Sequence, residues 1–589
     1  MQELFTFYAN QIEQHTTLLS KIKERLFTSS MLRLAIFCIA VAAVYFAFGN
    51  ARLVVGIILA TIMIFLFLVS RHSDLQYKSD KLNALIKLNK TEVEVLNRKF
   101  NGLPEGNEFK DPLHHFSQDI DLFGKGSFYQ YSNRTCLAQG TEVLAHILTE
   151  NSIAQIKQKQ EAIKELSKMP EWRQEYSAVA GLVKTETSYK TILKWLANYK
   201  SFVPEIMKHL PNVFSVFSAI LITVYFLGFV SGWIVTGWFF VGLGITGRFL
   251  KKINKLSSDT AKIQSTFHQY QKLILEIEKT SLSSELLKEK RATVVSKKVK
   301  TSKILKEFAR ILGALDQRNN MLMGLVGNAF LLWDLRQSYS IEKWIERYGL
   351  HVEQWFATIA FFDAYNSLGN FTFNHPTYTF PKINNNKTVL KSEGASHPLL
   401  DSMKSVPNDV EIDEEQFFIV TGANMAGKST FLRTISLQIV MANIGLPVCA
   451  KKAEYSPIKL ITSMRTTDSL TDDESYFYSE LKRLKFIVDE IKTERYFIVL
   501  DEILKGTNSI DKAKGSRRFV KRLVASNSTG IIATHDLSLC DIAKELKPVK
   551  NYYFDAEIVN GELHFDYKFK EGICQNMNAS FLLKKMEII

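Results

Sequence analysis

Residues 421–430, TGANMAGKST, have the types and spacing of a loop that binds phosphate groups. Gly422, four residues and then Gly427-Lys428-Ser429 form the G-x-x-x-x-G-K-[ST] pattern, after the apolar run FFIV and before a segment with helical periodicity. Glycines let the backbone curl so that its N–H groups converge on phosphate oxygens, and a helix N-terminus adds positive potential. A chance glycine-rich turn is the weaker alternative, because both flanking elements are present.

The pattern gives two side chains specific roles. Lys428 would reach the β and γ phosphates, and Ser429 would ligate Mg²⁺, so ATP and Mg²⁺ are the expected cofactors. The expected nucleotide-binding residues of the loop are Gly422, Ala423, Asn424, Met425, Ala426, Gly427, Lys428, Ser429 and Thr430.

Two further apolar runs end in residues that could support hydrolysis. Residues 496–502, YFIVLDE, read as a buried parallel strand ending in Asp501 and Glu502. Asp501 would hold Mg²⁺ through water as a metal residue beside the P-loop serine, and Glu502 would polarise the attacking water. A third strand within residues 529–536 ends near His535, which could sense the γ phosphate. A solvated strand end is the alternative for each run taken alone.

These segments resemble a known family. TGANMAGKSTFLRT is similar to the P-loop of the DNA mismatch repair protein MutS, and LDEILKGTNSID resembles that family's acidic strand with its Gly506-Thr507 turn. Residues 119–148 resemble the opening of the MutS core domain, residues 159–166 its continuation, and GASHPLL (394–400) the motif that enters the ATPase domain. The resemblance covers the chain from about residue 110 to 560.

Between the P-loop and the acidic strand, residues 466–481 resemble the MutS segment that serves as an ABC-type signature. The resemblance implies a head-to-tail homodimer, in which Ser475 contacts the γ phosphate of the nucleotide on the other subunit. The family usually has small residues and a basic one before this serine, whereas this chain has Asp472-Asp473-Glu474. Three acids beside a triphosphate are unfavourable, so either they face away or activation across the dimer is weaker.

Four apolar segments have the length of membrane-spanning helices. Residues 31–49 and 53–70 read as one hairpin, and residues 211–230 and 232–249 as a second. Buried core helices are the alternative, which the length of the segments and their lack of charge disfavour. Lysines and arginines flank the open ends of both hairpins, so the positive-inside rule predicts a multi-pass protein of the inner (cytoplasmic) membrane with its ATPase domain in the cytoplasm.

The expected fold class is mixed α and α/β. The chain would begin with a membrane hairpin, continue with a long-helix MutS-like core and lever domain that a second hairpin interrupts, and end with an ABC-type P-loop ATPase domain. The levers are expected near residues 150–205 and 255–315, and the short apolar run 321–333, with Asn328, is expected as a buried core helix. The predicted boundaries are 1–105, 106–385 and 386–589.

Cysteines and charge constrain the setting. The five cysteines show no metal spacing, and their odd number fits a reducing cytoplasm better than a disulfide framework. Residues 251–310 hold fifteen Lys or Arg and six Asp or Glu, so they supply nine of the fourteen net positive charges. The first turn of this segment fits the cytoplasmic side of a membrane, whereas the part near residues 297–300 could equally contact nucleic acid.

Two functions follow from these features. The first is a membrane-anchored MutS-like ATPase that acts on duplex or branched DNA in mismatch repair or DNA damage. The family's N-terminal mismatch-reading domain has no counterpart in the first hundred residues, and the second hairpin stands where its DNA clamp would be. The alternative is therefore an ATP-driven membrane-remodelling or signalling protein that binds no DNA. Transport is less favoured, because two hairpins make a small pore even in a dimer.

Overall fold

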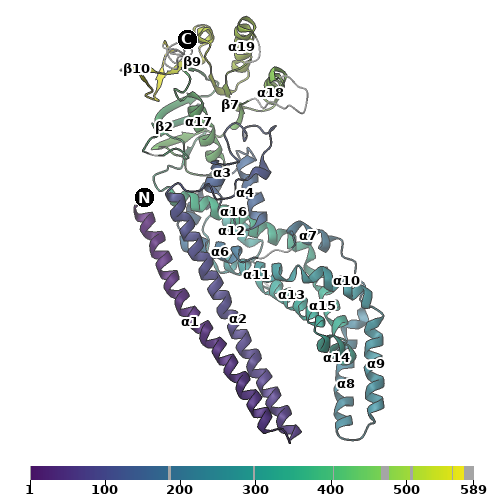
Figure 1. The fold of residues 1–589 in the computed structure, drawn as a ribbon. Coiled ribbons are helices and arrows are strands. Elements are labelled where there is room, and N and C mark those ends of the chain that lie inside the picture. Colours follow the sequence, from purple (N-terminus) through teal and green to yellow (C-terminus); the bar gives the residue numbers. More distant parts are fainter. Residues whose placement is uncertain are drawn as a thin grey trace.

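The computed structural model describes residues 2–183, 187–295, 299–401, 403–465, 476–504, 508–559 and 562–575. In this part of the chain, helices fill a helical region up to residue 374, and the strands lie in a sheet region between residues 382 and 571. Figure 1 shows the strands gathered at one end of the molecule and long helices that extend to the other end. The mixed, helix-rich fold agrees with the prediction.

The first two helices form a hairpin that extends well beyond the predicted apolar segments. α1 (Gln2–Phe46) and α2 (Ala51–Leu96) meet beside Asn50, whose side chain caps the first turn of α2. Both helices are long and apolar enough to cross a membrane, and their apolar stretches are almost entirely exposed. At the opposite end, the Tyr8 hydroxyl donates to Asn374 Oδ1 at 2.7 Å. This contact fixes the hairpin to the helical region.

The helical region packs around α16 (Val352–Asn374), whose neighbours include α4, α5 and α6. Apart from the two hairpins and α14 (Met321–Leu331), the other described helices of this region are η1 (Asn107–Phe109), α3 (Phe128–Ser132), α4 (Ala138–Thr149), α5 (Ile156–Ser167), α6 (Pro170–Gly181), α7 (Tyr189–Ala197), η2 (Glu205–Lys208), α10 (Leu250–Ala261), α11 (Gln264–Lys279), α12 (Glu285–Ala292), α13 (Thr301–Asp316), η3 (Gln317–Asn319), α15 (Trp333–Tyr348) and η4 (Gly349–His351).

The two ranges predicted to form long levers consist of shorter helices. None of the described helices within residues 150–205 or 255–315 exceeds 16 residues. Pro170 explains one break, because proline has no N–H to continue α5 but fits the first turn of α6. The levers are therefore chains of packed helices and not single rods.

The second apolar hairpin is shorter than predicted. α8 (Leu210–Phe226) has 17 residues, and α9 (Gly232–Gly247) has 16 and meets α10 at an angle of 66°. Among the described residues, two helices can cross a membrane by length and composition, or three if α9 and α10 count as one bent span. The prediction of four spanning helices is not supported. Figure 1 nevertheless shows both hairpins pointing away from the strands, toward the same end of the molecule.

The prediction that residues 321–333 form a buried core helix is wrong. α14 (Met321–Leu331) packs against α8 and α9, and much of its apolar surface is exposed. Met321 is 82% exposed and Val326 is 47% exposed. Apolar periodicity cannot distinguish a helix that packs inside a domain from one that packs on an exposed hairpin.

The sheet region is built on a six-stranded sheet with the order β12-β9-β4-β8-β7-β6. Five of these strands run parallel, and β12 pairs antiparallel with β9. A second sheet has the order β1-β5-β2-β3, and β10 pairs with β11. The strands are β1 (Lys382–Ile383), β2 (Thr388–Ala395), β3 (Asn408–Asp413), β4 (Phe417–Gly422), β5 (Lys452–Tyr455), β6 (Lys459–Ser463), β7 (Tyr496–Asp501), β8 (Thr529–Ala533), β9 (Val549–Phe554), β10 (Glu557–Val559), β11 (Glu562–His564) and β12 (Phe569–Glu571).

Both faces of the large sheet are buried, because alternate residues of β4 enter different cores. Phe418 and Val420 belong to the cluster that contains residues of α17 (Lys428–Asn443), whereas Phe417 and Ile419 pack with residues of the helices that follow β6 and β7. Those helices are α18 (Tyr476–Glu490) and α19 (Ser509–Val524), and η5 (Leu537–Asp541) and α20 (Ile542–Glu545) follow β8. Continuous apolar strands are expected in such a doubly covered parallel sheet.

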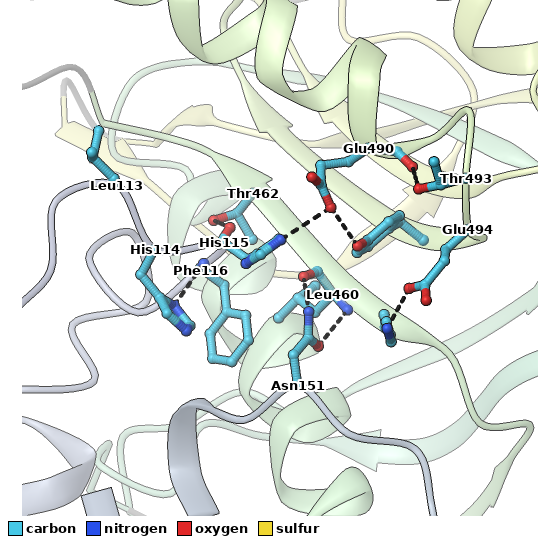
Figure 2. Close-up of polar contacts among 12 residues, drawn as sticks. Leu113, His114, His115, Phe116, Asn151, Leu460, Thr462, Glu490, Thr493 and Glu494 are labelled. Carbon is cyan, nitrogen blue, oxygen red and sulfur yellow. Dashed lines mark hydrogen bonds and ion pairs between the residues drawn. The ribbon is translucent and has the colours of Figure 1, made fainter. Parts of the chain in front are cut away.

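The helical region is joined to the sheet region along the edge strand β6. Figure 2 shows the Asn151 amide beside Leu460: Asn151 Nδ2 donates to the Leu460 carbonyl, and Leu460 N donates to Asn151 Oδ1, both at 2.9 Å. Two residues further on, Thr462 N donates to the His115 carbonyl at 2.9 Å. These bonds satisfy backbone groups that an edge strand leaves unpaired. Residues of the helical region thus occupy the position along β6 that a further strand of the sheet would take.

Ionic and aromatic contacts reinforce this joint. His115 Nε2 lies 3.3 Å from Glu490 Oε2, and the His115 ring stacks on Tyr496 with an interplanar angle of 11°. The Tyr496 hydroxyl donates to the same carboxylate at 2.7 Å and lowers the pKa of Glu490. Arg483 of α18 donates to the His115 carbonyl at 2.6 Å. The joint therefore connects the helical region to β6, α18 and the start of β7.

A buried aspartate lies at the centre of the helical region. Asp363 of α16 is fully buried and accepts from the backbone N–H groups of Cys136 and Leu137 at 3.0 and 2.9 Å. Gly140 is required beside it, because an added Cβ would lie 2.1 Å from Asp363 Oδ2. Burial raises the pKa of Asp363 to about 7. Its protonation therefore changes near neutral pH.

We predict that Asn151→Ala weakens the joint. The substitution leaves the N–H and C=O of Leu460 without these partners, and such buried groups cost about 1–3 kcal/mol. Hydrogen exchange at the Leu460 amide should accelerate by roughly tenfold or more, since 1.4 kcal/mol corresponds to that factor. Asn198→Ala is the matched control, because among the described residues the Asn198 side chain bonds only to the Lys194 carbonyl at the end of α7. Unchanged exchange at Leu460 in Asn151→Ala would contradict the role of this amide.

We predict that Asp363 makes stability depend on pH. Its folded pKa of about 7 lies above the value of about 3.9 for an unfolded aspartate, so the folded state binds the proton more tightly. This contribution to stability is present below pH 4 and is lost as the pH rises through 7. The unfolding temperature should fall between pH 5 and 8 more steeply in the wild type than in Asp363→Asn. Glu353→Gln, at the exposed start of α16, should keep the wild-type slope.

Candidate nucleotide-binding site

The predicted phosphate loop connects the buried strand β4 to α17. Gly422 and Gly427 have φ values of 150° and 105°, which a side chain would strain. An added Cβ would lie 2.7 Å from the Phe554 carbonyl at Gly422 and 3.1 Å from the Tyr567 ring at Gly427. The two glycines are thus required by backbone conformation and by close neighbours.

Lys428 places its ammonium group inside the curl of this loop. The side chain is 6% exposed, and Nζ donates to the carbonyls of Gly422 and Ala423 at 2.7 and 3.0 Å. Nζ also lies 3.3 Å from His535 Nε2. Burial lowers the pKa of Lys428, while Asp501 and Glu502 act in the opposite direction. The amine is held beside the loop backbone that would surround a phosphate.

The ends of three parallel strands bring the other predicted side chains together. β4, β8 and β7 are neighbours, and Asp501 is aligned with Ala533, which directly precedes Thr534-His535. Ser429 Oγ donates to Asp501 Oδ2 at 2.6 Å, and His535 Nε2 lies 3.0 Å from Glu502 Oε1. Carboxyl ends of parallel strands meet at one edge, where ligands commonly bind. The arrangement puts two candidate metal oxygens next to a carboxylate–imidazole pair.

These residues border a cavity of about 680 Å³. Of the predicted loop residues, Ala423, Asn424, Met425, Gly427, Lys428, Ser429 and Thr430 line it, together with Asp501, Glu502 and His535. Ala426 is fully buried, and Gly422 ends β4 behind the lining. The predicted Ser475 and the turn 506–507 lie outside the described residues.

The donor set fits Mg²⁺ with a nucleotide. Mg²⁺ is usually held by one or two protein oxygens, several waters and substrate phosphates, and Ser429 and Asp501 provide two adjacent oxygens. The described residues contain no cluster of three or more His, Cys, Asp or Glu that could hold a metal by themselves. A buried lysine, a loop with its glycines and an adjacent cavity likewise fit a phosphate chain.

The cavity also has a wall that the motif did not predict. Ser396 and His397 follow β2, and Tyr567 lies against Gly427. Burial and the neighbouring Arg433 lower the pKa of His397 to about 4, so its imidazole is neutral at pH 7. A neutral ring and a tyrosine could contact a nucleotide base or ribose. His397 could have been identified from its place in the GASHPLL motif. Tyr567 could not, because it lies far from the P-loop in sequence and in no motif.

Asp121 links the cavity to the helical region. It pairs with Arg433 of α17, the helix that begins at Lys428, at 3.2 Å and with Arg465 at 2.8 Å. The adjacent Asp119 accepts from Arg465 N at 2.8 Å. Neither aspartate was singled out from the sequence, because contacts across more than 300 residues leave no periodic pattern. A movement of α17 would reach the helical region through this ion pair.

Known proteins that are similar to this chain match the part that contains the candidate site. Residues 418–585 match the family model of MutS domain V. The DNA mismatch repair protein MutS of Staphylococcus haemolyticus is 32% identical over 203 residues, covering 33% of this chain and 23% of that protein. The MutS protein of Methanosarcina acetivorans is 35% identical over 219 residues, covering 36% and 24%, respectively.

The match concerns only part of each protein. The chain spans about a quarter of the length of the curated relatives that it matches, including 27% of the MutS protein of Clostridium tetani, at 30% identity over 243 residues. The family-model match includes the phosphate loop, the acidic strand and His535. The C-terminal part of the chain is thus similar to MutS domain V and to the matching part of these MutS proteins.

Proposed function

We propose that this protein is a membrane-anchored MutS-like ATPase that binds and hydrolyses Mg²⁺-ATP in the cavity beside β4, β8 and β7. The single observation that carries the proposal is the convergence there of Lys428, the Ser429–Asp501 pair and the Glu502–His535 pair. The names of the relatives and the spacing of the loop support it. The proposed ATPase domain comprises residues 386–589, and the core and lever domain residues 106–385.

Each side chain has a role in this proposal. Lys428 would exchange a backbone carbonyl for β and γ phosphate oxygens, and Ser429 and Asp501 would hold Mg²⁺, which neutralises charge on those oxygens. Glu502 would accept a proton from the water that attacks the γ phosphorus in line with the leaving oxygen. His535, 3.0 Å from Glu502, would orient that carboxylate and contact the γ phosphate.

Two ATPase domains would pair head to tail around the nucleotide, as the family resemblance implies. Ser475 of one subunit would then contact the γ phosphate bound by Lys428 of the other, and hydrolysis would release the pair. The ion pair of Asp121 with Arg433 could transmit this movement, because it connects the P-loop helix α17 to the helical region. Pairing of the ATPase domains would thereby move the helices that lead to the hairpins.

The membrane part of the proposal is multi-pass anchoring in the cytoplasmic membrane. α1 and α2 are long and apolar enough to span it, and the second hairpin points to the same end of the molecule (Figure 1). Lysines and arginines at the open ends of both hairpins favour a cytoplasmic location for the ATPase domain. The N-terminal anchor comprises residues 1–105.

DNA is the first candidate partner and would connect the protein to mismatch repair or DNA damage. The names of the relatives and the positive charge of residues 251–310 support a duplex or branched DNA. A second candidate is membrane remodelling or signalling without DNA. A specific observation favours it: Lys251, Lys252 and Lys255 are exposed directly after the 66° bend at the base of the second hairpin, where lipid phosphates would lie.

We predict that Glu502→Gln traps an ATP-bound dimer. Loss of the general base should lower turnover by roughly 10²–10⁴-fold, while the loop and Lys428 keep nucleotide affinity. ATPase assays and light scattering with and without ATP measure both effects. Glu545→Gln is the matched control, because Glu545 pairs with Arg517 and does not line the cavity. Wild-type turnover in Glu502→Gln would refute its assignment as the base.

We predict that DNA stimulates the ATPase of the full chain in detergent. Duplex, branched and single-stranded DNA are added separately at low salt, and the stimulation should decline steeply as salt rises, because lysine–phosphate contacts release counterions. Anionic lipid is tested in parallel. No DNA binding at low salt together with stimulation by lipid would select the second candidate.

A further inference from the structure

α14 is an apolar helix at the base of the second hairpin, and its outer surface is uncovered. Among the described side chains of Met321–Leu331, the exposed large ones are Met321, Met323, Leu325, Val326 and Leu331, with exposed fractions between 36% and 82%. At 11 residues it is about 16 Å long, too short to cross a hydrocarbon core of about 30 Å. It therefore cannot span a membrane that the hairpin enters.

α14 is part of a packed three-helix unit. An added Cβ on Gly242 of α9 would lie 2.1 Å from the Ala329 carbonyl, so the two backbones are in close approach. Small residues permit such packing between helices in lipid. Phe239 and Phe330 have ring centroids 5.8 Å apart. The inner face of α14 is thus fixed on α9 and leaves only its outer face for a partner.

Trp238 joins the two helices of the hairpin itself. Its ring stacks on Phe214 of α8 at 4.4 Å, and its Nε1 donates to Ser218 Oγ at 2.8 Å. α14 also contacts α8. The unit α8–α9–α14 is consequently a wedge with a defined shape and not a loose hairpin.

The polar groups of α14 are used internally. Asn328, its one polar side chain, donates to the Gly324 carbonyl at 2.7 Å and accepts from Asp334 N at 2.9 Å. Arg318, just before the helix, pairs with the same Asp334 at 2.8 Å. The outer face of α14 therefore offers a partner apolar contact without hydrogen bonds, as hydrocarbon requires.

Exposed cations mark the level of the membrane surface beside this unit. Lys208 precedes α8, and Arg248 and Lys251 follow α9 at the 66° bend. Gly242, which contacts Ala329, is six residues before Arg248, or about 9 Å along the helix. Interfacial helices bury their apolar face about 5–10 Å into the headgroup–acyl boundary. α14 is thus at the depth of that boundary.

We infer that the outer face of α14 lies in the cytoplasmic leaflet of the bilayer, so that α8, α9 and α14 form one three-helix wedge that enters the membrane. The inference rests on the proposed membrane insertion of the second hairpin. It adds a third lipid-contacting helix that makes the wedge wider at its cytoplasmic base than at its tip. The two points where α14 joins η3 and α15 connect this leaflet directly to the helical region.

The test places a fluorophore at single positions of the full chain. Cys38→Ser removes the exposed cysteine, and this parent gives the background from Cys136 and Cys449, which are half-buried. Val326→Cys reports on α14, and Ile220→Cys on α8. Leu350→Cys is the matched control, because Leu350 is 94% exposed but lies beyond the far end of α15. Labelled proteins are reconstituted into vesicles of phosphatidylcholine and phosphatidylglycerol.

Quenching by brominated lipids and by aqueous iodide distinguishes the outcomes. We expect the label at 326 to be quenched severalfold more by lipids brominated near the headgroup end of the acyl chain than by deep ones, the label at 220 by deeper ones, and the label at 350 by iodide alone. Iodide quenching at 326 with lipid quenching at 220 would overturn the role of α14 while leaving the hairpin in the membrane. Iodide quenching at both would overturn the insertion itself. Protection of 326 from both quenchers would show a protein partner, such as a second copy, and would also overturn the inference.

Discussion

The completion of the edge strand β6 by the helical region is the contact on which the rest of the molecule depends. A strand at the edge of a sheet leaves N–H and C=O groups unpaired, and here Asn151 and the His115 carbonyl satisfy them. Because β6 belongs to the same sheet as the P-loop strand β4, this joint fixes the nucleotide cavity relative to the helices. Without such a joint, a movement of the residues around the cavity would not be transmitted to the helices in a defined direction.

The sequence predicted the centre of the candidate site because its signals are local. The glycines, Lys428 and Ser429 lie within eight residues, and Asp501 and Glu502 directly follow an apolar run. Strand adjacency could be anticipated only as a general rule for parallel sheets, and β4, β8 and β7 follow it. The mixed fold class and the N-terminal hairpin were predictable for the same reason, since continuous apolar runs signal both buried strands and membrane-length helices.

The remaining features depend on contacts between distant residues. Asn151 meets Leu460 across 309 positions, and Asp121 meets Arg433 across a similar distance, so neither pair produces a periodic pattern. The interpretation of residues 321–333 failed differently. Their apolar character was read correctly, but Asn328 suggested a protein interior, whereas its bonds to Gly324 and Asp334 N make it compatible with a helix on an exposed hairpin. The composition of a segment shows how apolar it is. Whether its apolar side chains face the protein interior or the outside is decided by packing against other helices.

The positions of the lysines and arginines distinguish the two candidate partners, DNA and the lipid bilayer. A lysine or arginine at the membrane surface has its charge neutralised by lipid phosphate and cannot contribute fully to DNA binding at the same time. Lys208, Arg248 and Lys251 surround the base of the wedge, so their charge belongs to the bilayer if the hairpin is inserted. Any DNA surface must then be formed by cations farther along the helical region, such as Lys279 and Lys288, which are exposed on α11 and α12. The depth of the wedge therefore sets how much of the basic segment remains available to nucleic acid.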